Sequence, residues 1–246
     1  MAKTYVCSDV HSHLNVFEQA LDYIGADAKL YIIGDVIDKG PDGIKVLQKV
    51  MKDPRCELLM GNHDMMFLQY LYCKKEFHPD TYEFREIEYN WVMNNGGRAT
   101  LRDYKKLSEN EKMEIYKYLE NLPLLKMITI NNRDFILVHA SCQNIELENL
   151  KEINTQDLIS KNGGYDWTNN LIWGREETHI PGKITITGHT YVQYLGHNDI
   201  IVSDDGLWYD IDCGLARRST KSRLALLCLD DLECHYFNPP EYAEVQ

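Results

Sequence analysis

Two patterns of apolar and polar positions take turns along the first 75 residues of the chain. Short apolar runs of strand length are followed by stretches in which apolar residues recur every three or four positions, as on one face of a helix. The predicted strands are 5–7, 30–33 and 57–60, and the predicted helices are 14–24, 44–51 and 65–72. This order predicts a β-α-β-α-β-α unit with a parallel sheet.

Residues 76–122 predict a mainly helical insertion after this unit. Glu83–Met93 has the period of a helix and carries apolar and aromatic residues on one face, among them Trp91. Ser108 and Glu111 form the pattern of a capping box and predict the start of a further helix. We expect the aromatic residues of the insertion to be core residues, while the insertion itself could form part of the rim of a site.

The remainder of the chain predicts mainly β structure. A hairpin is expected over 126–139, because two apolar runs flank the polar residues 131–134. Residues 141–182 show no regular period. The predicted strands that follow are Ile184–Thr187, Ile200–Ser203, Leu207–Asp212, Leu224–Leu229 and Cys234–Phe237. We expect a second sheet that faces the first, in a single domain of residues 1–246 that ends in a loose acidic tail.

Polar side chains follow five of the predicted strands, directly beyond each apolar run. The segments are Ser8–His11, Gly34–Asp38, Gly61–Asp64, His139-Ala140 and Gly188–Thr190. Ligands of open α/β sheets gather beyond the carboxyl ends of strands, so residues placed there are candidates for metal binding or acid–base chemistry. One Gly-Asp after a strand is a common turn, but five such ends indicate a shared edge where the side chains meet.

Charge and cysteine usage argue against several classes of partner. The formal net charge is −12 and the pI is about 5.2, whereas sequence-independent nucleic-acid binding depends on Lys and Arg at the phosphates. No apolar run approaches the length of a membrane span, so we expect neither nucleic acid nor membrane as partner. Seven cysteines without Cys-x-x-Cys spacing, and no apolar signal region before the first strand, predict a cytoplasmic protein with reduced thiols.

The residue types at the shared edge suit metal ions. Asp9 and His11 are two positions apart and would point to one face if the strand geometry persists. Asp35 has two oxygens that can bridge two ions, and further candidate ligands are Asn62, His139 and His189. Oxygen and nitrogen ligands without thiolate suit manganese, iron, zinc or cobalt. Two divalent ions about 3.5–4 Å apart turn a bridging water into hydroxide and neutralise phosphate oxygens, which is the chemistry of phosphoester hydrolysis.

The same segments resemble the motifs of a known family. In order and spacing they are similar to the motifs GDxHG, GDxxDRG, GNH[ED], HAG and GHT of the calcineurin-like metallophosphoesterases. In this chain the corresponding segments are Ser8-Asp9-Val10-His11-Ser12, Gly34-Asp35-Val36-Ile37-Asp38-Lys39-Gly40, Gly61-Asn62-His63-Asp64, His139-Ala140 and Gly188-His189-Thr190. The nearest branch is that of the phosphoprotein phosphatases, particularly the small bacterial and phage lambda-type enzymes. The resemblance spans nearly the whole chain and implies the α/β class with a four-layer αββα sandwich of the metallo-dependent phosphatase type.

The resemblance also implies roles for individual residues. Asp9, His11 and Asp35 would hold one metal, and the other would be held by Asp35, Asn62, His139 and His189. His63, paired with Asp38, would protonate the leaving oxygen, and we expect manganese to support activity.

Several positions depart from the family pattern. Lys39 stands where the family usually has Arg, which keeps the charge but gives up the two-pronged grip on phosphate. Ser8, Ser12 and Ser141 replace glycines of the motifs, which affects loop geometry rather than metal ligation. Arg175, in Trp173-Gly174-Arg175-Glu176, resembles the second phosphate-binding arginine of the lambda-type enzymes.

Three functions remain open at this point. The leading one is a metal-dependent serine/threonine protein phosphatase that also accepts small phosphoesters. The alternative is a dinucleoside polyphosphate hydrolase acting on diadenosine tetraphosphate, since that family shares Gly61–Asp64 and Gly40-Pro41. In that family, however, the position matching Asp38 is typically Ala. An Asp there favours the protein phosphatase, because a serine or threonine alkoxide needs a proton to leave, whereas a nucleotide departs readily as an anion.

The third function is a catalytically idle scaffold, against which the complete set of candidate metal ligands argues. A nuclease is disfavoured by Tyr191, where those relatives carry another His.

Overall fold

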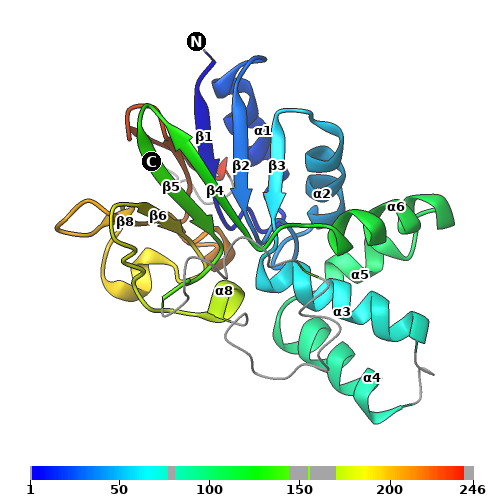
Figure 1. Ribbon diagram of the computed structural model, residues 1–246. Coiled ribbons are helices and arrows are strands. Elements are labelled where there is room, and N and C mark those ends of the chain that lie inside the picture. The colour runs from blue at the N-terminus through cyan, green and yellow to red at the C-terminus, as the bar shows by residue number, and fades with distance from the viewer. Residues whose placement is uncertain (1, 77–80, 144–154, 156–169, 241–246) are drawn as a thin grey trace.

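The computed structural model describes residues 2–76, 81–143, 155 and 170–240 of the chain. The predicted strand–helix repeat is confirmed over the first of these ranges (Figure 1). Its elements are β1 (Thr4–Cys7), α1 (Leu14–Ile24), β2 (Lys29–Ile33), α2 (Gly43–Lys52), β3 (Cys56–Leu59) and α3 (Asn62–Glu76). The three strands are parallel, with Cys7 opposite Ile32 and Ile33 opposite Leu59, so their carboxyl ends lie at one edge of the sheet.

The remaining strands divide between two sheets. They are β4 (Leu125–Ile130), β5 (Arg133–Val138), β6 (Ile184–Thr187), β7 (Ile201–Val202), β8 (Trp208–Asp210), β9 (Leu224–Cys228) and β10 (Cys234–Phe237). The first sheet has the order β10-β9-β1-β2-β3, and the second has the order β4-β5-β6-β8-β7. Both sheets are mixed, because β9 is antiparallel to β1 in the first and β4 is antiparallel to β5 in the second.

One sequence expectation about the sheets is wrong. The strands after residue 183 do not all form the second sheet, because β9 and β10 extend the first sheet on the free side of β1. The reason lies in β9, whose five residues are all buried. Leu224 and Leu226 face the core that contains α1 and α2, while Ala225 and Leu227 face the second sheet. A strand that is apolar on both faces is stable only inside a covered sheet.

The two sheets pack face to face around an apolar core, with helices on the outer face of the first (Figure 1). Ile33 and Leu59 of the first sheet meet Phe135, Leu137 and Ile186 of the second. On the outer side of the second sheet the structure describes α8 (Asn170–Trp173). Most of the irregular stretch 141–182 lies outside the described residues.

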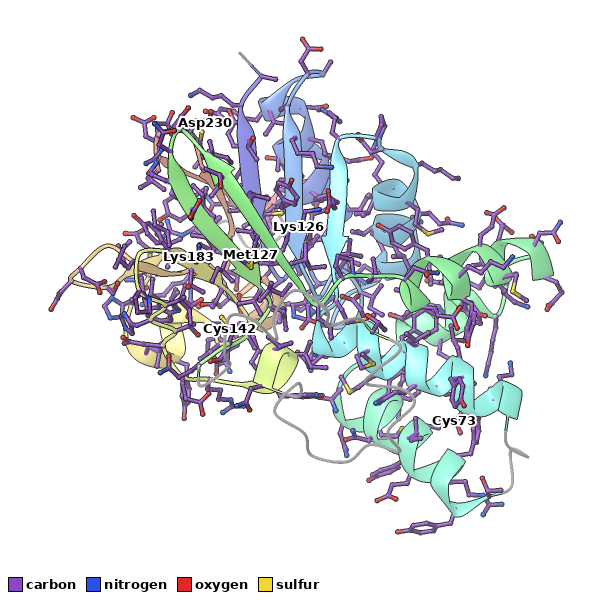
Figure 2. The ribbon with its side chains drawn as sticks, in the orientation of Figure 1. Cys73, Lys126, Met127, Cys142, Lys183 and Asp230 are labelled. Atoms are coloured by element: carbon purple, nitrogen blue, oxygen red, sulfur yellow. The ribbon has the colours of Figure 1, made fainter. Side chains whose placement is uncertain are left out.

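An ion-pair cluster links the rims of the two sheets. In Figure 2, Lys126 projects from β4, and its ammonium lies 2.6 Å from Glu57 Oε1 of β3. Lys29 of β2 approaches the other oxygen of Glu57 at 3.0 Å. All three side chains are partly exposed, so this cluster orients the sheets more than it stabilises them.

The insertion is helical, as expected, and lies beyond the carboxyl ends of β1–β3 (Figure 1). It consists of α4 (Tyr82–Glu88), the π-helix η1 (Tyr89–Asn94), α5 (Arg98–Tyr104) and α6 (Glu109–Glu120). The capping box of Ser108 and Glu111 is confirmed at the start of α6. The helix predicted over 83–93 is present, but it changes from an α-helix to a π-helix at Tyr89, a form that is often found at functional sites. Within the described ranges, no helix has the length and apolar content that a membrane crossing requires.

Candidate functional site

The loops that follow β1, β2 and β6 carry several residues in a strained backbone conformation. Asp9, His11, Asp35, Asp38 and His189 have positive φ angles, between 41° and 68°, although none is glycine. Such residues cost free energy and persist only where the surrounding structure fixes them, which happens preferentially at functional sites. The expectation that Asp9 and His11 share a face by strand alternation is therefore wrong in its geometry, because β1 already ends at Cys7. Their side chains nevertheless meet, since the left-handed turns redirect them.

Close contact between two loops brings the strand ends together. A Cβ atom on Gly34 would lie 2.6 Å from the Cα of Gly61 and 2.6 Å from His139 Nδ1. Since real Cβ atoms do not tolerate such distances, only glycine allows the loop after β2 to touch the loop after β3. This approach places Asp35 beside the first turn of α3, where His63 N donates to Asp35 Oδ1 at 2.9 Å.

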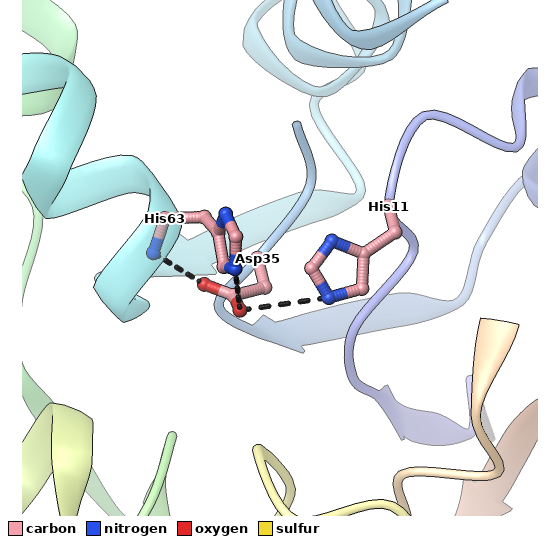
Figure 3. Close-up of side chains that lie close together, drawn as sticks. All are labelled: His11, Asp35 and His63. Atoms are coloured by element: carbon pink, nitrogen blue, oxygen red, sulfur yellow. Dashed lines mark hydrogen bonds and ion pairs between the residues drawn. The ribbon is translucent and has the colours of Figure 1, made fainter. Parts of the chain in front are cut away.

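The second carboxylate oxygen of Asp35 lies at the centre of the site. Asp35 Oδ2 is 3.6 Å from His11 Nε2, 3.9 Å from His63 Nε2 and 3.6 Å from His139 Nε2 (Figure 3 shows the first two). His11 Nε2 is also 3.6 Å from Asp9 Oδ1. These separations are too long for hydrogen bonds and leave room for an ion between the groups.

The hydrogen bonds of the histidines indicate what belongs in that space. His11 Nδ1 lies 3.1 Å from the carbonyl oxygen of Ile37, and His139 Nδ1 lies 2.8 Å from that of Ile33. A carbonyl oxygen can only accept, so both rings donate from Nδ1, and each ring in its neutral form presents the lone pair of Nε2 to the carboxylate of Asp35. Lone pairs facing a carboxylate repel each other unless a cation lies between them. The donor set thus fits a divalent metal.

Asn62, His139 and His189 form the other half of the site. Asn62 Oδ1 is 2.9 Å from both His139 Nε2 and His189 Nδ1. Two histidine–carboxylate groups have ligand atoms close enough for one ion each: His11, Asp35 and His63 in one, and Asp35, His139 and His189 in the other. Asp35 belongs to both, as the bridging role implied by the sequence requires. His63 appears beside the first group although sequence reasoning gave it no ligand role.

Burial shapes the ionisation of the ligands. It raises the pKa of Asp35 well above its usual range, and the nearby charge of Asp9 adds to this effect. Asp9 is buried as well, but hydrogen bonding with His11 and the charges of His139 and His11 outweigh burial and hold the pKa of Asp9 low. Burial, with contributions from His139 and Arg175, lowers the pKa of His189 to about 3. His189 is therefore neutral at pH 7, in the form that binds metal.

The predicted pair of His63 and Asp38 is present. His63 Nδ1 lies 2.9 Å from Asp38 Oδ2, and the side chain of Asp38 is fully buried. Burial raises the pKa of Asp38 to about 6, although hydrogen bonds from Thr100 and Trp91 oppose the shift. Burial also lowers the pKa of His63 well below its usual range, and the charges of His11 and Lys39 contribute. The hydrogen bond to Asp38 fixes the orientation of the His63 ring.

The two cationic residues act on different residues of this centre. Lys39 is half-buried beside Asp38, and its charge lowers the pKa values of Asp38 and His63. Arg175 is exposed and lies close enough to His189 to lower its pKa. It lines a cavity of about 230 Å³ together with Gly188 and Thr190, the two neighbours of His189. Both cations therefore act electrostatically on residues of the site.

Sequence reasoning assigned no role to three residues that support the site. Asp64, fully buried, accepts from the backbone N–H groups of Asp35 at 2.8 Å and of Gly61 at 3.2 Å. Trp91 and Thr100 of the insertion both donate to Asp38. Asp64 could have been noticed as the acid that closes the Gly-Asn-His-Asp segment. No local signal distinguished Trp91 from an ordinary core residue.

Proteins of similar sequence are bis(5'-nucleosyl)-tetraphosphatases. The asymmetrical enzyme PrpE of Oceanobacillus iheyensis is 27% identical over 213 residues, which cover 77% of this chain and 78% of that protein. The symmetrical enzymes of Proteus mirabilis and Wigglesworthia glossinidia are 35% and 36% identical, over 26% and 28% of this chain. These two matches span only 25% and 27% of the relatives' own lengths.

Solved structures with the same fold include several phosphatases. A yeast protein serine/threonine phosphatase superposes with a TM-score of 0.62 at 14% identity, covering 100% of this chain and 82% of that one. A protein described as a candidate diadenosine tetraphosphatase gives 0.61 at 15% identity, covering 96% and 93%. The family model of the calcineurin-like phosphoesterases matches residues 2–210. The chain therefore belongs to the calcineurin-like phosphoesterase family.

Proposed function

We propose that this member of the family is a serine/threonine protein phosphatase that depends on two divalent metal ions, manganese first among them. Asp9, His11 and Asp35 would hold one ion, and Asp35, Asn62, His139 and His189 the other. When bound, the ions would activate a water molecule as nucleophile and neutralise phosphate oxygens. The observation that favours a phosphorylated protein as substrate is the buried hydrogen bond between His63 and Asp38.

The residues of the chain would divide the remaining work. Lys39 and Arg175 hold phosphate oxygens, and their charges already act on Asp38 and His189. Asp38 accepts from His63 Nδ1 and thereby aims His63 Nε2 toward the centre of the site, 3.9 Å from Asp35 Oδ2. The step needs the His63 ring protonated on both nitrogens in the complex with the negatively charged phosphate: as the bond from phosphorus to the serine or threonine oxygen breaks, that oxygen takes the proton of His63 Nε2, and Nδ1–H stays bonded to Asp38.

The demand for this proton depends on the leaving group. An alkoxide is strongly basic and needs a proton in the transition state, and general acid catalysis typically contributes about 10²–10⁴ in rate. A nucleotide that leaves a polyphosphate departs as an anion and gains little. The presence of a proton donor formed by His63 and Asp38 therefore favours phosphoserine and phosphothreonine as substrates.

A second candidate is hydrolysis of dinucleoside polyphosphates such as diadenosine tetraphosphate. The observation that favours it is the match to the asymmetrical tetraphosphatase of Oceanobacillus iheyensis, which runs over most of both chains. An idle scaffold is disfavoured because the candidate metal ligands converge with their lone pairs facing inward. The seven cysteines are free thiols, which supports a cytoplasmic location.

The test compares two leaving groups in three proteins. His63→Asn, Asp38→Asn and the parent are loaded with manganese and assayed on a phosphoserine peptide and on p-nitrophenyl phosphate, whose leaving group is far less basic. If His63 donates the proton, both variants lose about 10²–10⁴ in turnover on the peptide and much less on the nitrophenyl ester. Equal losses on both substrates would remove His63 as proton donor and with it the argument for a protein substrate.

A further inference from the structure

The carboxylate of Asp38 has more partners than the His63 ring alone. Trp91 Nε1–H donates to Asp38 Oδ2 at 2.7 Å, the same oxygen that His63 Nδ1 contacts at 2.9 Å. The hydroxyl of Thr100 donates to Asp38 Oδ1 at 2.6 Å and accepts from the backbone N–H of Asp38 at 3.2 Å. Both partners come from the helical insertion, and both are buried, with exposures of 0% for Trp91 and 1% for Thr100.

The backbone around Asp38 makes such partners necessary. Asp38 lies in an irregular loop, and Asp38 and Lys39 have φ angles of 66° and 59°. No helix or strand fixes the direction of the Asp38 side chain. An indole N–H on one oxygen and a hydroxyl on the other prevent the carboxylate from rotating away from His63.

From these contacts we propose that Trp91 and Thr100 are positioning residues for proton donation, acting through Asp38 on His63. The inference rests on the proposed function, since it assumes that His63 protonates the leaving oxygen. It gives the insertion a task beyond packing, because the proton donor would be assembled from three separate segments of the chain.

The local structure of the insertion holds Trp91 against Asp38. Trp91 lies in the π-helix η1 and stacks on Phe67 of α3, with ring centroids 5.0 Å apart and an interplanar angle of 21°. A Cβ on Gly97 would lie 2.6 Å from the indole nitrogen, so only glycine allows the following loop to close over the ring. Gly96, with a φ of 82°, packs in the same way on the side chain of Lys39. The segment 91–100 thus contacts both the proton-donor pair and one phosphate anchor.

A purely structural role makes a different prediction. If Trp91 and Thr100 only stabilised the fold, their loss would reduce the fraction of active enzyme and lower the rates on all substrates by the same factor. If they position Asp38, the loss depends on how much proton the leaving group needs. The ratio of turnover on a phosphoserine peptide to turnover on p-nitrophenyl phosphate separates the two roles, because the fraction of active enzyme cancels.

The experiment measures this ratio for Trp91→Phe, Thr100→Val, Thr100→Ser, His63→Asn and a control. Trp91→Phe keeps an aromatic ring against Phe67 but removes the N–H donor, and Thr100→Val removes the hydroxyl at nearly constant shape. The control is Tyr104→Phe, which removes a hydroxyl from another buried residue of α5; among the described residues, the hydrogen-bond partners of the Asp38 carboxylate are His63, Trp91 and Thr100, not Tyr104. All proteins are loaded with manganese and checked for folding by circular dichroism.

We expect Trp91→Phe and Thr100→Val each to lower the ratio about tenfold, the order that one hydrogen bond to a charged group contributes. Thr100→Ser should restore the ratio, and Tyr104→Phe should leave it at the parent value. If His63→Asn lowers the ratio but Trp91→Phe and Thr100→Val do not, the positioning role is wrong while the proposed function stands. If His63→Asn leaves the ratio unchanged, the proposed function itself fails.

Discussion

Replacement of Asp35 by asparagine should abolish the stabilisation of the fold by both metal ions. The structure places Asp35 Oδ2 within 3.6–3.9 Å of three imidazole nitrogens, so the variant removes the one charge that both candidate ion sites share. Asparagine keeps an oxygen that can accept from His63 N, as Asp35 Oδ1 does at 2.9 Å, so the start of α3 should stay in place. The effect is therefore assigned to charge rather than to shape.

Binding linkage gives the expected magnitude. An ion present at 100 times its dissociation constant stabilises the folded state by about 2.7 kcal/mol. For a chain of this size, 1 kcal/mol shifts Tm by about 2–4 °C, so manganese should raise the Tm of the parent by about 5–10 °C per site. Asp35→Asn should lose nearly all of this shift.

The metal-free protein should respond in the opposite direction. Burial and the charge of Asp9 raise the pKa of Asp35, and a carboxyl whose folded pKa is raised destabilises the folded state at every pH above the pKa it has in the unfolded chain. Asp35→Asn removes this ionisable group and should raise the Tm of the metal-free protein at pH 7.

Differential scanning fluorimetry with and without manganese measures both effects. The matched control is Asp103→Asn: Asp103 is half-buried, lies far from any candidate ligand in sequence and, within the described part of the chain, forms its ion pairs with Arg102 and Lys106, so this variant should keep the full metal-induced shift. A normal manganese shift in Asp35→Asn would show that Asp35 does not bridge the ions.

Three further predictions concern anchoring and stability. Arg175→Ala should raise KM and lower kcat for a phosphoserine peptide without releasing manganese, measured by steady-state kinetics and metal analysis; parent values of both constants would make Arg175 a surface residue. Lys39→Arg should lower KM, because a guanidinium grips phosphate with two N–H groups, and an unchanged or higher KM would count against Lys39 as an anchor. Hydrogen bonds from Arg55 at 2.9 and 2.7 Å lower the pKa of Asp53, so the pair stabilises the fold above about pH 4, and this contribution fades as the pH falls toward the lowered pKa. Asp53→Asn should therefore cost about 0.5–1 kcal/mol in urea unfolding at pH 7 and nothing once the carboxyl of Asp53 is protonated; a cost independent of pH would refute the pairing.

Much of the fold could be predicted because buried strands and amphipathic helices have different periods. The apolar runs before Asp9, Asp35 and Asn62 are short and end abruptly, which located the edge where the candidate ligands meet. The pairing of β9 with β1 could not be predicted in the same way, because a local pattern does not specify which sheet a strand joins. The clue in the sequence is that all five residues of Leu224–Cys228 are apolar, since a strand at the rim of a second sheet would expose one face.

The supporting residues of the site were harder to predict, for a physical reason. Trp91 has the spacing of a core aromatic and is indeed fully buried, but its indole N–H also needs a partner, and only the tertiary structure shows that this partner is Asp38. The left-handed conformations of Asp9, His11 and Asp35 were equally hidden, because no glycine marks them. Period and residue type identify the candidate ligands, whereas the network that aims them depends on contacts between distant segments.

The most direct test of the account is a comparison of kcat/KM of the manganese-loaded protein for a phosphoserine peptide and for diadenosine tetraphosphate in the same buffer. We predict that the peptide is the better substrate, and that His63→Asn reverses the preference because only the peptide needs its proton. A parent protein that prefers diadenosine tetraphosphate, with a preference that His63→Asn leaves unchanged, would contradict the proposed function.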